Sequence, residues 1–120
     1  MGTLPSLQTL WIVQSELRDL RGIPECGTVK EFSLGYPRGL ISIDGIESFK
    51  GLKQLEIEGA KQLHDYMPIA SLKELDYLGI FGSGEPDSLG FLDSLPLLKR
   101  AVIGNNEYTK IDGKFIRERM

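Results

Sequence analysis

The chain contains one cysteine, Cys26, and one histidine, His64, the two side chains that could form a nucleophile and its base. Such a pair works only when the two side chains lie within hydrogen-bonding distance. Cys26 falls in a regular series of apolar positions, where a cysteine usually packs as a small hydrophobic group, and His64 follows a leucine in a different segment. One Cys and one His also supply too few ligands for a closed zinc site. These residues therefore predict a protein that is not an enzyme and that binds no metal or cofactor.

A second candidate is the glycine-rich stretch at residues 79–84, Gly-Ile-Phe-Gly-Ser-Gly, which has the glycine content of a phosphate-binding loop. A true phosphate loop continues with Gly-Lys-Ser/Thr and a long helix. Here the chain continues with Glu85-Pro86-Asp87, whose two carboxylates would repel a phosphate. We interpret these glycines as a turn that leaves a strand.

Aspartates form the third candidate, because one recurs in each of five similar segments. They are Asp19, Asp44, Asp65, Asp87 and Asp112. Either these carboxylates form an acidic ladder that binds metal, or each accepts backbone N–H bonds at the start of a short helical turn. Their offsets shift from segment to segment, and capping is the habitual role of Asp, so we favour capping.

Composition restricts the class of protein further. The 120 residues are 41% hydrophobic and 26% charged, with a net charge of -3, which matches a globular domain and not a nucleic-acid-binding surface. The longest strictly apolar run is Trp11 to Val13, far shorter than a membrane span. The first residues lack a secretory signal and there is a single Cys, so we expect a cytoplasmic protein that contacts neither membrane nor nucleic acid.

The elements that position these residues follow from an internal period. Apolar triplets with the spacing i, i+3, i+5 occur five times, and their starts are 22, 23, 23 and 23 residues apart. They are Leu7-Leu10-Ile12, Val29-Phe32-Leu34, Leu52-Leu55-Ile57, Leu75-Leu78-Ile80 and Leu98-Ala101-Ile103. The alternation within each triplet predicts a short strand with one buried face.

After each of the first four triplets comes an arm with an apolar residue at every third position, which predicts 3-10 turns or a polyproline-like return. The four series are Leu17-Leu20-Ile23-Cys26, Leu40-Ile43-Ile46-Phe49, Leu63-Tyr66-Ile69-Leu72 and, with Pro86 in the first slot, Leu89-Leu92-Leu95. One such unit cannot bury its own apolar stripe, whereas stacked units can. We therefore expect a single domain over 1–120, an α/β solenoid of five coils with repeats at about 4–26, 27–49, 50–72, 73–95 and 96–120.

This pattern resembles the leucine-rich repeat family, whose strand segment reads LxxLxLxxN. The closest copies are Leu7–Ile12, Leu52–Ile57 and Leu75–Ile80, and the first arm, Leu17–Cys26, is similar to the subtype found in bacterial internalin-like and phosphatase-regulatory proteins. The resemblance implies a short parallel sheet on a concave face, 3-10 or short helical turns on the convex side, and binding of a partner protein.

The family's Asn, which satisfies backbone groups between coils, is matched only by Asn106. Ser15, Pro37, Ala60 and Ser83 stand in the other four places. Serine can make part of such a bond, whereas proline and alanine cannot. We expect the loops of the second and third repeats to be irregular and to satisfy their backbone groups in another way.

The positions between the buried strand residues define rows on the exposed face of the sheet. The rows are Thr9-Glu31-Gln54-Tyr77-Arg100, Trp11-Ser33-Glu56-Gly79-Val102, Val13-Gly35-Glu58-Phe81-Gly104 and Gln14-Tyr36-Gly59-Gly82-Asn105. Exposed aromatic residues commonly anchor interfaces, and acidic neighbours favour a basic partner. The predicted partner-binding residues are Trp11, Glu31, Tyr36, Glu56, Glu58, Tyr77, Phe81 and Arg100. Two structural alternatives stand beside this: that Trp11 serves only to cover the open end of the array, and that Tyr77 and Phe81 serve only to pack on each other.

Three functions remain at this point. The first is a protein-interaction module that uses this face, the second an inhibitor or immunity-type regulator that blocks a basic enzyme cleft, and the third a structural segment of a larger repeat protein. No amphipathic helix precedes the first repeat, so we expect that it either pairs with another copy or continues from further repeats. At the other end, Ile111, Phe115 and Ile116 with their charged neighbours predict a polar C-terminal cap.

Overall fold

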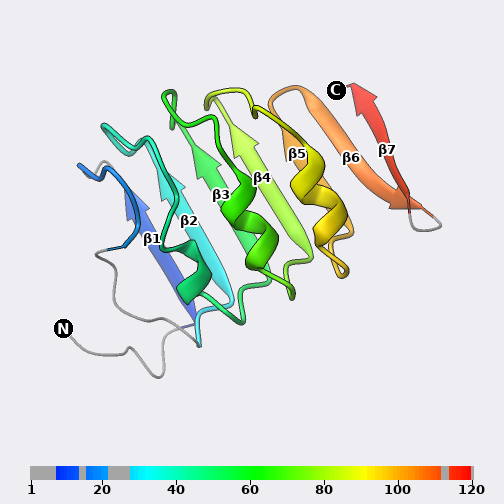
Figure 1. The fold of residues 1–120 in the computed structure, drawn as a ribbon, viewed down its shortest axis with the longest axis horizontal. Helices are drawn as coiled ribbons and strands as arrows, with labels where there is room; N and C mark the ends of the chain where they lie inside the picture. The colour runs from blue at the N-terminus through cyan, green and yellow to red at the C-terminus, as the bar shows by residue number, and fades with distance from the viewer. Residues whose placement is uncertain (1–7, 14–15, 22–27, 112–113, 120) are drawn as a thin grey trace.

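A computed structural model describes residues 8–13, 16–21, 28–111 and 114–119, with residues 110, 111 and 114–119 described by their backbone. Seven strands form a single sheet in sequence order, β1 to β7 (Figure 1). Their bounds are β1 Thr9–Val13, β2 Glu31–Gly35, β3 Gln54–Glu58, β4 Tyr77–Phe81, β5 Arg100–Ile103, β6 Asn106–Ile111 and β7 Lys114–Arg119. The first five strands are parallel, and β6 and β7 are added antiparallel. All five predicted strands are confirmed, and the sheet as a whole is mixed.

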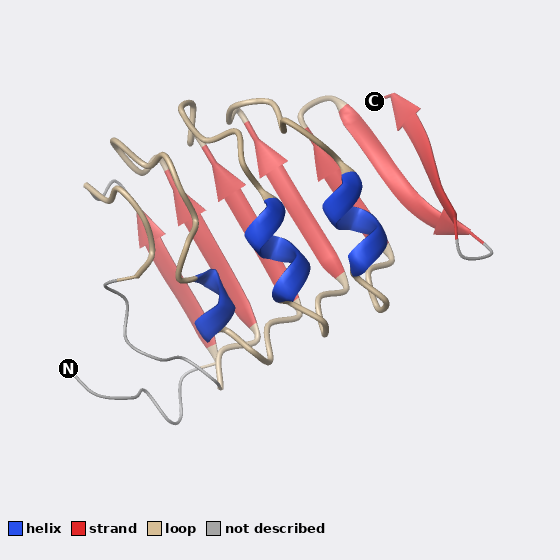
Figure 2. Ribbon diagram, viewed as in Figure 1, coloured by secondary structure: helices blue, strands red, loops and turns tan. Residues whose placement is uncertain are grey.

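Three 3-10 helices cover one face of this sheet: η1 (Ile46–Ser48), η2 (Met67–Ser71) and η3 (Gly90–Ser94) (Figure 2). They follow β2, β3 and β4 in the arms where every third residue is apolar, as the spacing predicts. The opposite face of the sheet, which carries the predicted rows, is called the open face below. The first arm lies partly outside the described residues.

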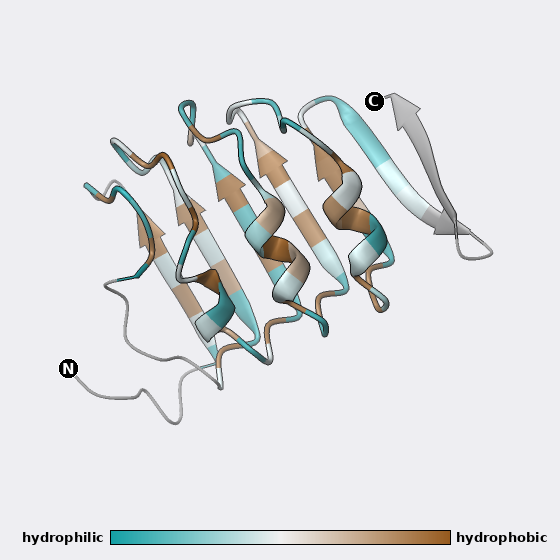
Figure 3. Cartoon of the chain, viewed as in Figure 1, coloured by the Kyte–Doolittle hydropathy of each residue, from teal (hydrophilic) through white to brown (hydrophobic). Residues whose placement is uncertain are grey.

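The core fills the space between the sheet and the 3-10 helices. The predicted triplets of the second to fifth repeats are all buried, and so are all four arm positions in the second and third repeats. The strands β1 to β4 accordingly show alternating bands of higher and lower hydropathy (Figure 3). The rings of Phe32 and Phe49 are stacked, with centroids 4.7 Å apart and planes 14° apart. In the first repeat, Leu10 and Ile12 are half-buried against this core.

The fourth arm differs from its prediction at one slot. Leu89 is 36% exposed, whereas Phe91 is fully buried. The Phe91 ring lies 6.3 Å from the Tyr66 ring of the preceding arm, and η3 begins only at Gly90. The larger aromatic side chain therefore occupies the core in place of the predicted leucine.

The fifth repeat has a strand but no return arm. After β5 the chain turns at residues 104–105 and runs back as β6, so that Asn106 pairs with Ile103 instead of joining two coils. The expected fifth coil is wrong in this respect, because a two-residue Gly-Asn connection closes a hairpin. Ile111 belongs to β6, and Phe115 and Ile116 belong to β7. The side chains of these three residues, which were expected to cap the core, lie outside the described part of the structure.

The loops after β2 and β3 form hydrogen bonds to the next repeat without the family's Asn, and after β2 the Tyr36 N–H donates to the Glu58 carbonyl at 2.7 Å. The Ser83 hydroxyl accepts a hydrogen bond from the Ala60 N–H at 3.0 Å and donates one to the Phe81 carbonyl at 3.1 Å. A backbone N–H of the third repeat is thus satisfied by a side chain of the fourth. Pro37, which is buried, has no N–H to satisfy.

Tyr66 is expected to make the folded protein less stable at high pH. Its buried hydroxyl lies 2.7 Å from the Gly84 carbonyl and 3.2 Å from the Leu63 carbonyl, and burial raises its pKa to about 12. The folded state therefore favours the neutral Tyr66 hydroxyl. Because its pKa is higher in the folded than in the unfolded chain, the free energy of unfolding keeps its full value below pH ~10, the unfolded pKa, and declines as the pH rises towards ~12. We expect a loss of roughly 2–3 kcal/mol over that window. Denaturant titrations from pH 9 to 12 should show this slope reduced in Tyr66→Phe and retained in Tyr36→Phe, whose ring is exposed. Equal slopes in wild type and Tyr66→Phe would contradict it.

Candidate functional site

The first three predicted rows are confirmed along β1 to β4, because the strands pair in the expected register. Thr9, Glu31, Gln54, Tyr77 and Arg100 are successive partners across β1 to β5. Trp11, Ser33, Glu56, Gly79 and Val102 form the second row, and Val13, Gly35, Glu58 and Phe81 the third. Residues 22 or 23 positions apart in sequence are therefore brought side by side on the open face.

Most of the predicted binding residues are exposed on this face or at its rim. The Trp11 side chain is 73% exposed and the Tyr36 side chain 53%. Glu31, Glu56, Glu58 and Arg100 are exposed, whereas Tyr77 and Phe81 are half-buried. The open face therefore divides into an acidic end with Trp11 and an aromatic end with Tyr77 and Phe81.

At the aromatic end, Tyr77 and Phe81 lie over the glycine between them. A Cβ atom on Gly79 would lie 2.6 Å from Cε2 of Phe81 and 3.0 Å from the Tyr77 hydroxyl, so the missing side chain leaves room for both rings. Burial, followed by the charge of Glu56, raises the pKa of Tyr77, and Arg100 opposes this shift. Both side chains thus lie over Gly79 of their own strand, and part of each remains exposed.

Arg100 is held by two neighbours on this face. Its Nε donates to the Glu107 carboxylate at 2.5 Å, and its guanidinium carbon lies 5.8 Å from the centre of the Tyr77 ring. The hydrogen bond and charge of Glu107 raise the pKa of Arg100. Glu107 comes from β6, so this ion pair exists because the hairpin replaces the expected fifth arm. Sequence periodicity could not reveal it.

Val102 was expected to be exposed in its row, but it is buried, with only 3% of its surface exposed. The strand β5 lies between β4 and β6 and is not an edge, and Val102 pairs with Glu107 across β6. Neighbours on both sides therefore cover a side chain that an edge strand would leave open.

At the acidic end, a hollow of about 220 Å³ opens between β1, β2 and β3. Its lining residues are Trp11, Glu31, Phe32, Ser33, Gln54 and Glu56. None of the ion pairs within the described part of the chain involves Glu31, Glu56 or Glu58. This end of the face therefore carries negative charge that the described residues leave uncompensated by an ion pair.

Tyr36 has a backbone conformation that the sequence did not indicate. Its φ is +52°, the only positive φ among the described non-glycine residues, whereas glycines occupy the same row position in the next two repeats, with φ +77° at Gly59 and +57° at Gly82. A Cβ on Gly59 would lie 2.5 Å from Cδ1 of Tyr36, so the ring lies over that glycine. A tyrosine held in this region is strained by roughly 1–2 kcal/mol. The chain thus presents an aromatic ring at the rim where its neighbouring repeats use glycine.

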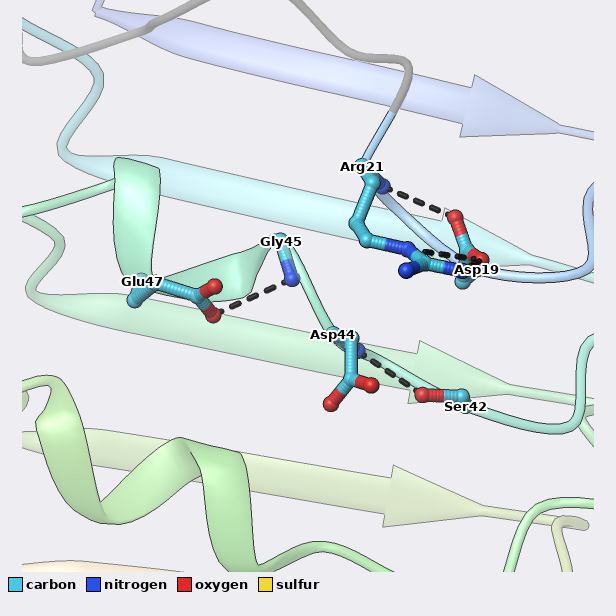
Figure 4. Close-up of polar contacts among 6 residues, drawn as sticks. All are labelled: Asp19, Arg21, Ser42, Asp44, Gly45 and Glu47. Carbon is cyan, nitrogen blue, oxygen red and sulfur yellow. Dashed lines mark hydrogen bonds and ion pairs between the residues drawn. The ribbon is translucent and has the colours of Figure 1, made fainter.

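The aspartates cap turns only in part (Figure 4). Asp19 accepts hydrogen bonds from the backbone and guanidinium of Arg21, which lower its pKa, and Asp65 accepts one from the Met67 N–H at the start of η2. Before η1, the Ser42 hydroxyl accepts from the Asp44 N–H and the Glu47 carboxylate accepts from the Gly45 N–H.

The expected capping is therefore confirmed for Asp65 and is wrong for Asp44, while Asp19 accepts the Arg21 N–H at a place where no helical turn is described. Before η3, Ser88 supplies the acceptor for the Gly90 N–H, and Asp112 lies outside the described residues. Within the described ranges, no three His, Cys, Asp or Glu side chains gather closely enough to hold a metal ion.

The remaining chemical candidates are His64, the glycine-rich stretch and Cys26. His64 is exposed, and its Nδ1 lies 2.8 Å from the Glu85 carbonyl, to which it can donate. The glycine-rich stretch spans the end of β4 and the bend that leaves it: Gly82 has a positive φ, and Gly84 packs so closely on the Leu63 carbonyl that a Cβ would overlap it. Cys26 lies outside the described residues.

Comparison with known proteins adds no further assignment. No family model, no curated protein and no solved structure matches the chain. In the described segments, no helix is long and apolar enough to cross a membrane.

Proposed function

We propose that this protein is a leucine-rich-repeat type solenoid that acts as a non-enzymatic protein-interaction module. Its open face is the concave binding surface, and its partner is a protein with a basic patch. The proposal is supported by the in-register rows, which gather the exposed side chains of Trp11, Glu31, Glu56 and Glu58 on a sheet face that no described helix covers. An aromatic anchor surrounded by like charges favours a partner of opposite charge.

Capture from lysate with two matched variants tests this function. In the open-face variant, Glu31, Glu56 and Glu58 become arginine; in the control variant, Glu74, Glu85 and Asp93 become arginine, all exposed and off the rows. Both variants change the net charge equally. A true partner is expected to be recovered with the wild type and the control, and to bind the open-face variant at least about tenfold more weakly.

Recovery of the same proteins at the same level with all three forms would overturn the proposal. Circular dichroism of each form checks that the fold is retained. For the wild type, the association rate with a captured partner should also fall between low and physiological salt, because exposed charges are screened over about 8–10 Å.

A further inference from the structure

We propose that the hollow at the acidic end of the open face receives one lysine or arginine side chain of the partner. This deepens the proposed function and rests on it, because it names the group that the interaction face recognises. The hollow joins three strands, with Trp11 from β1, Glu31 and Ser33 from β2, and Gln54 and Glu56 from β3.

The size of the hollow suits a single side chain. Its volume of about 220 Å³ is smaller than the pockets of about 300–1,000 Å³ that hold small-molecule ligands. A long, flexible cationic side chain can lay its apolar stem along an indole and keep its charged end beside carboxylates. Exposed Trp11 provides the apolar wall, and Glu31 and Glu56 provide the charge.

At the other end of the open face, the chain itself places a cation beside an aromatic ring and a carboxylate. There Arg100 lies over the ring of Tyr77 and is bonded to the carboxylate of Glu107. At the acidic end an aromatic residue and two carboxylates are present, but the described chain supplies no ion-pairing cation. A partner's lysine or arginine would complete the arrangement that Arg100 completes in the chain itself.

Trp11 is the only tryptophan of the chain, so it reports directly on the hollow. The probe is a blocked pentapeptide, Ser-Gly-Arg-Gly-Ser, compared with the same peptide carrying citrulline, which has nearly the shape of arginine but no charge. The measurements are Trp11 fluorescence and the NMR shift of its indole N–H during titration. We expect saturable binding of the arginine peptide and at least about tenfold weaker binding of the citrulline peptide.

Matched variants separate the contribution of the carboxylates to peptide binding from that of the Trp11 ring. The double variant Glu31→Gln/Glu56→Gln should weaken the arginine peptide about tenfold, whereas Glu74→Gln/Glu85→Gln should not change it. In Trp11→Leu, followed through the Ser33 amide shift, binding should weaken about two- to fivefold, which corresponds to an exposed cation–π contact.

Equal shifts with both peptides, no saturable shift, or an arginine response unaffected by Glu31→Gln/Glu56→Gln would overturn the inference. If the peptide fails while the open-face variant still loses its captured partner, the interaction face stands and the cation site is wrong. If the peptide binds as expected while capture is unchanged by charge reversal, the cation site stands and the proposed function is wrong.

Discussion

Replacing Phe49 with alanine is expected to lower the free energy of unfolding by about 4 kcal/mol. The Phe49 side chain is 0% exposed, follows η1 and stacks on Phe32 of β2, so its removal leaves a cavity between the sheet and the 3-10 layer. The stacked pair adds roughly 0.5–1.5 kcal/mol beyond the buried area. Because domains of this size are stable by only about 5–15 kcal/mol, the variant should unfold at a much lower urea concentration.

Two further variants control this measurement. Phe49→Leu keeps most of the buried volume and should cost about 1–2 kcal/mol. Met67→Ala truncates a side chain that is 47% exposed at the start of η2 and should cost less than about 1 kcal/mol. Urea unfolding followed by circular dichroism ranks the three, and a loss in Phe49→Ala no larger than in Met67→Ala would show that the stack is not part of the core.

The second large effect is expected from Gly45→Ala. Gly45 has φ +105°, and a Cβ there would overlap the backbone carbonyl of Leu20 and lie 2.6 Å from the Arg21 nitrogen. The Leu20 N–H donates to the Asp44 carbonyl at 2.9 Å, so these two segments are held together at this point. The left-handed conformation and the overpacking together should cost about 3 kcal/mol.

Gly104→Ala isolates the first of these two costs. Gly104 also has a positive φ, +61°, but a Cβ there would meet no atom within 4 Å. This variant should therefore lose only about 1 kcal/mol. Denaturant unfolding of both variants measures how much more free energy of unfolding Gly45→Ala loses than Gly104→Ala. Equal losses would contradict the prediction, because they would mean that the first and second repeats separate easily enough to admit a methyl group.

The repeating part of the fold was predictable because a single pattern specifies it several times. The triplet spacing identified two buried residues in each of β2 to β5, and the register Glu31-Gln54-Tyr77 followed from the period alone. In a sheet of equal repeats, knowing one strand places its neighbours, since side chains alternate between the two faces.

The departures occur where the pattern stops. The turn signal at Gly104-Asn105 favours a hairpin, and Asp112-Gly113 in the sequence favours another, but both were interpreted within the period. As a result the Arg100–Glu107 ion pair and the burial of Val102 were missed.

Other features depend on three-dimensional packing and have no local sequence signal. Phe91 takes the core slot expected for Leu89, because a ring fills the space between neighbouring arms better. The positive φ of Tyr36 could be suspected only because Gly59 and Gly82 occupy the same row position in the next two repeats.

The order of the strands has a consequence for how the chain folds. Each strand hydrogen-bonds only to the strands before and after it, and every parallel pairing joins residues 22 or 23 positions apart, from Thr9–Glu31 to Tyr77–Arg100. Each new parallel pairing therefore closes a loop of nearly the same length at nearly the same entropic cost. Structure can begin in any repeat and grow one neighbour at a time in both directions, so the rate of folding should depend on the best-packed central repeats, while the terminal strands open and close first.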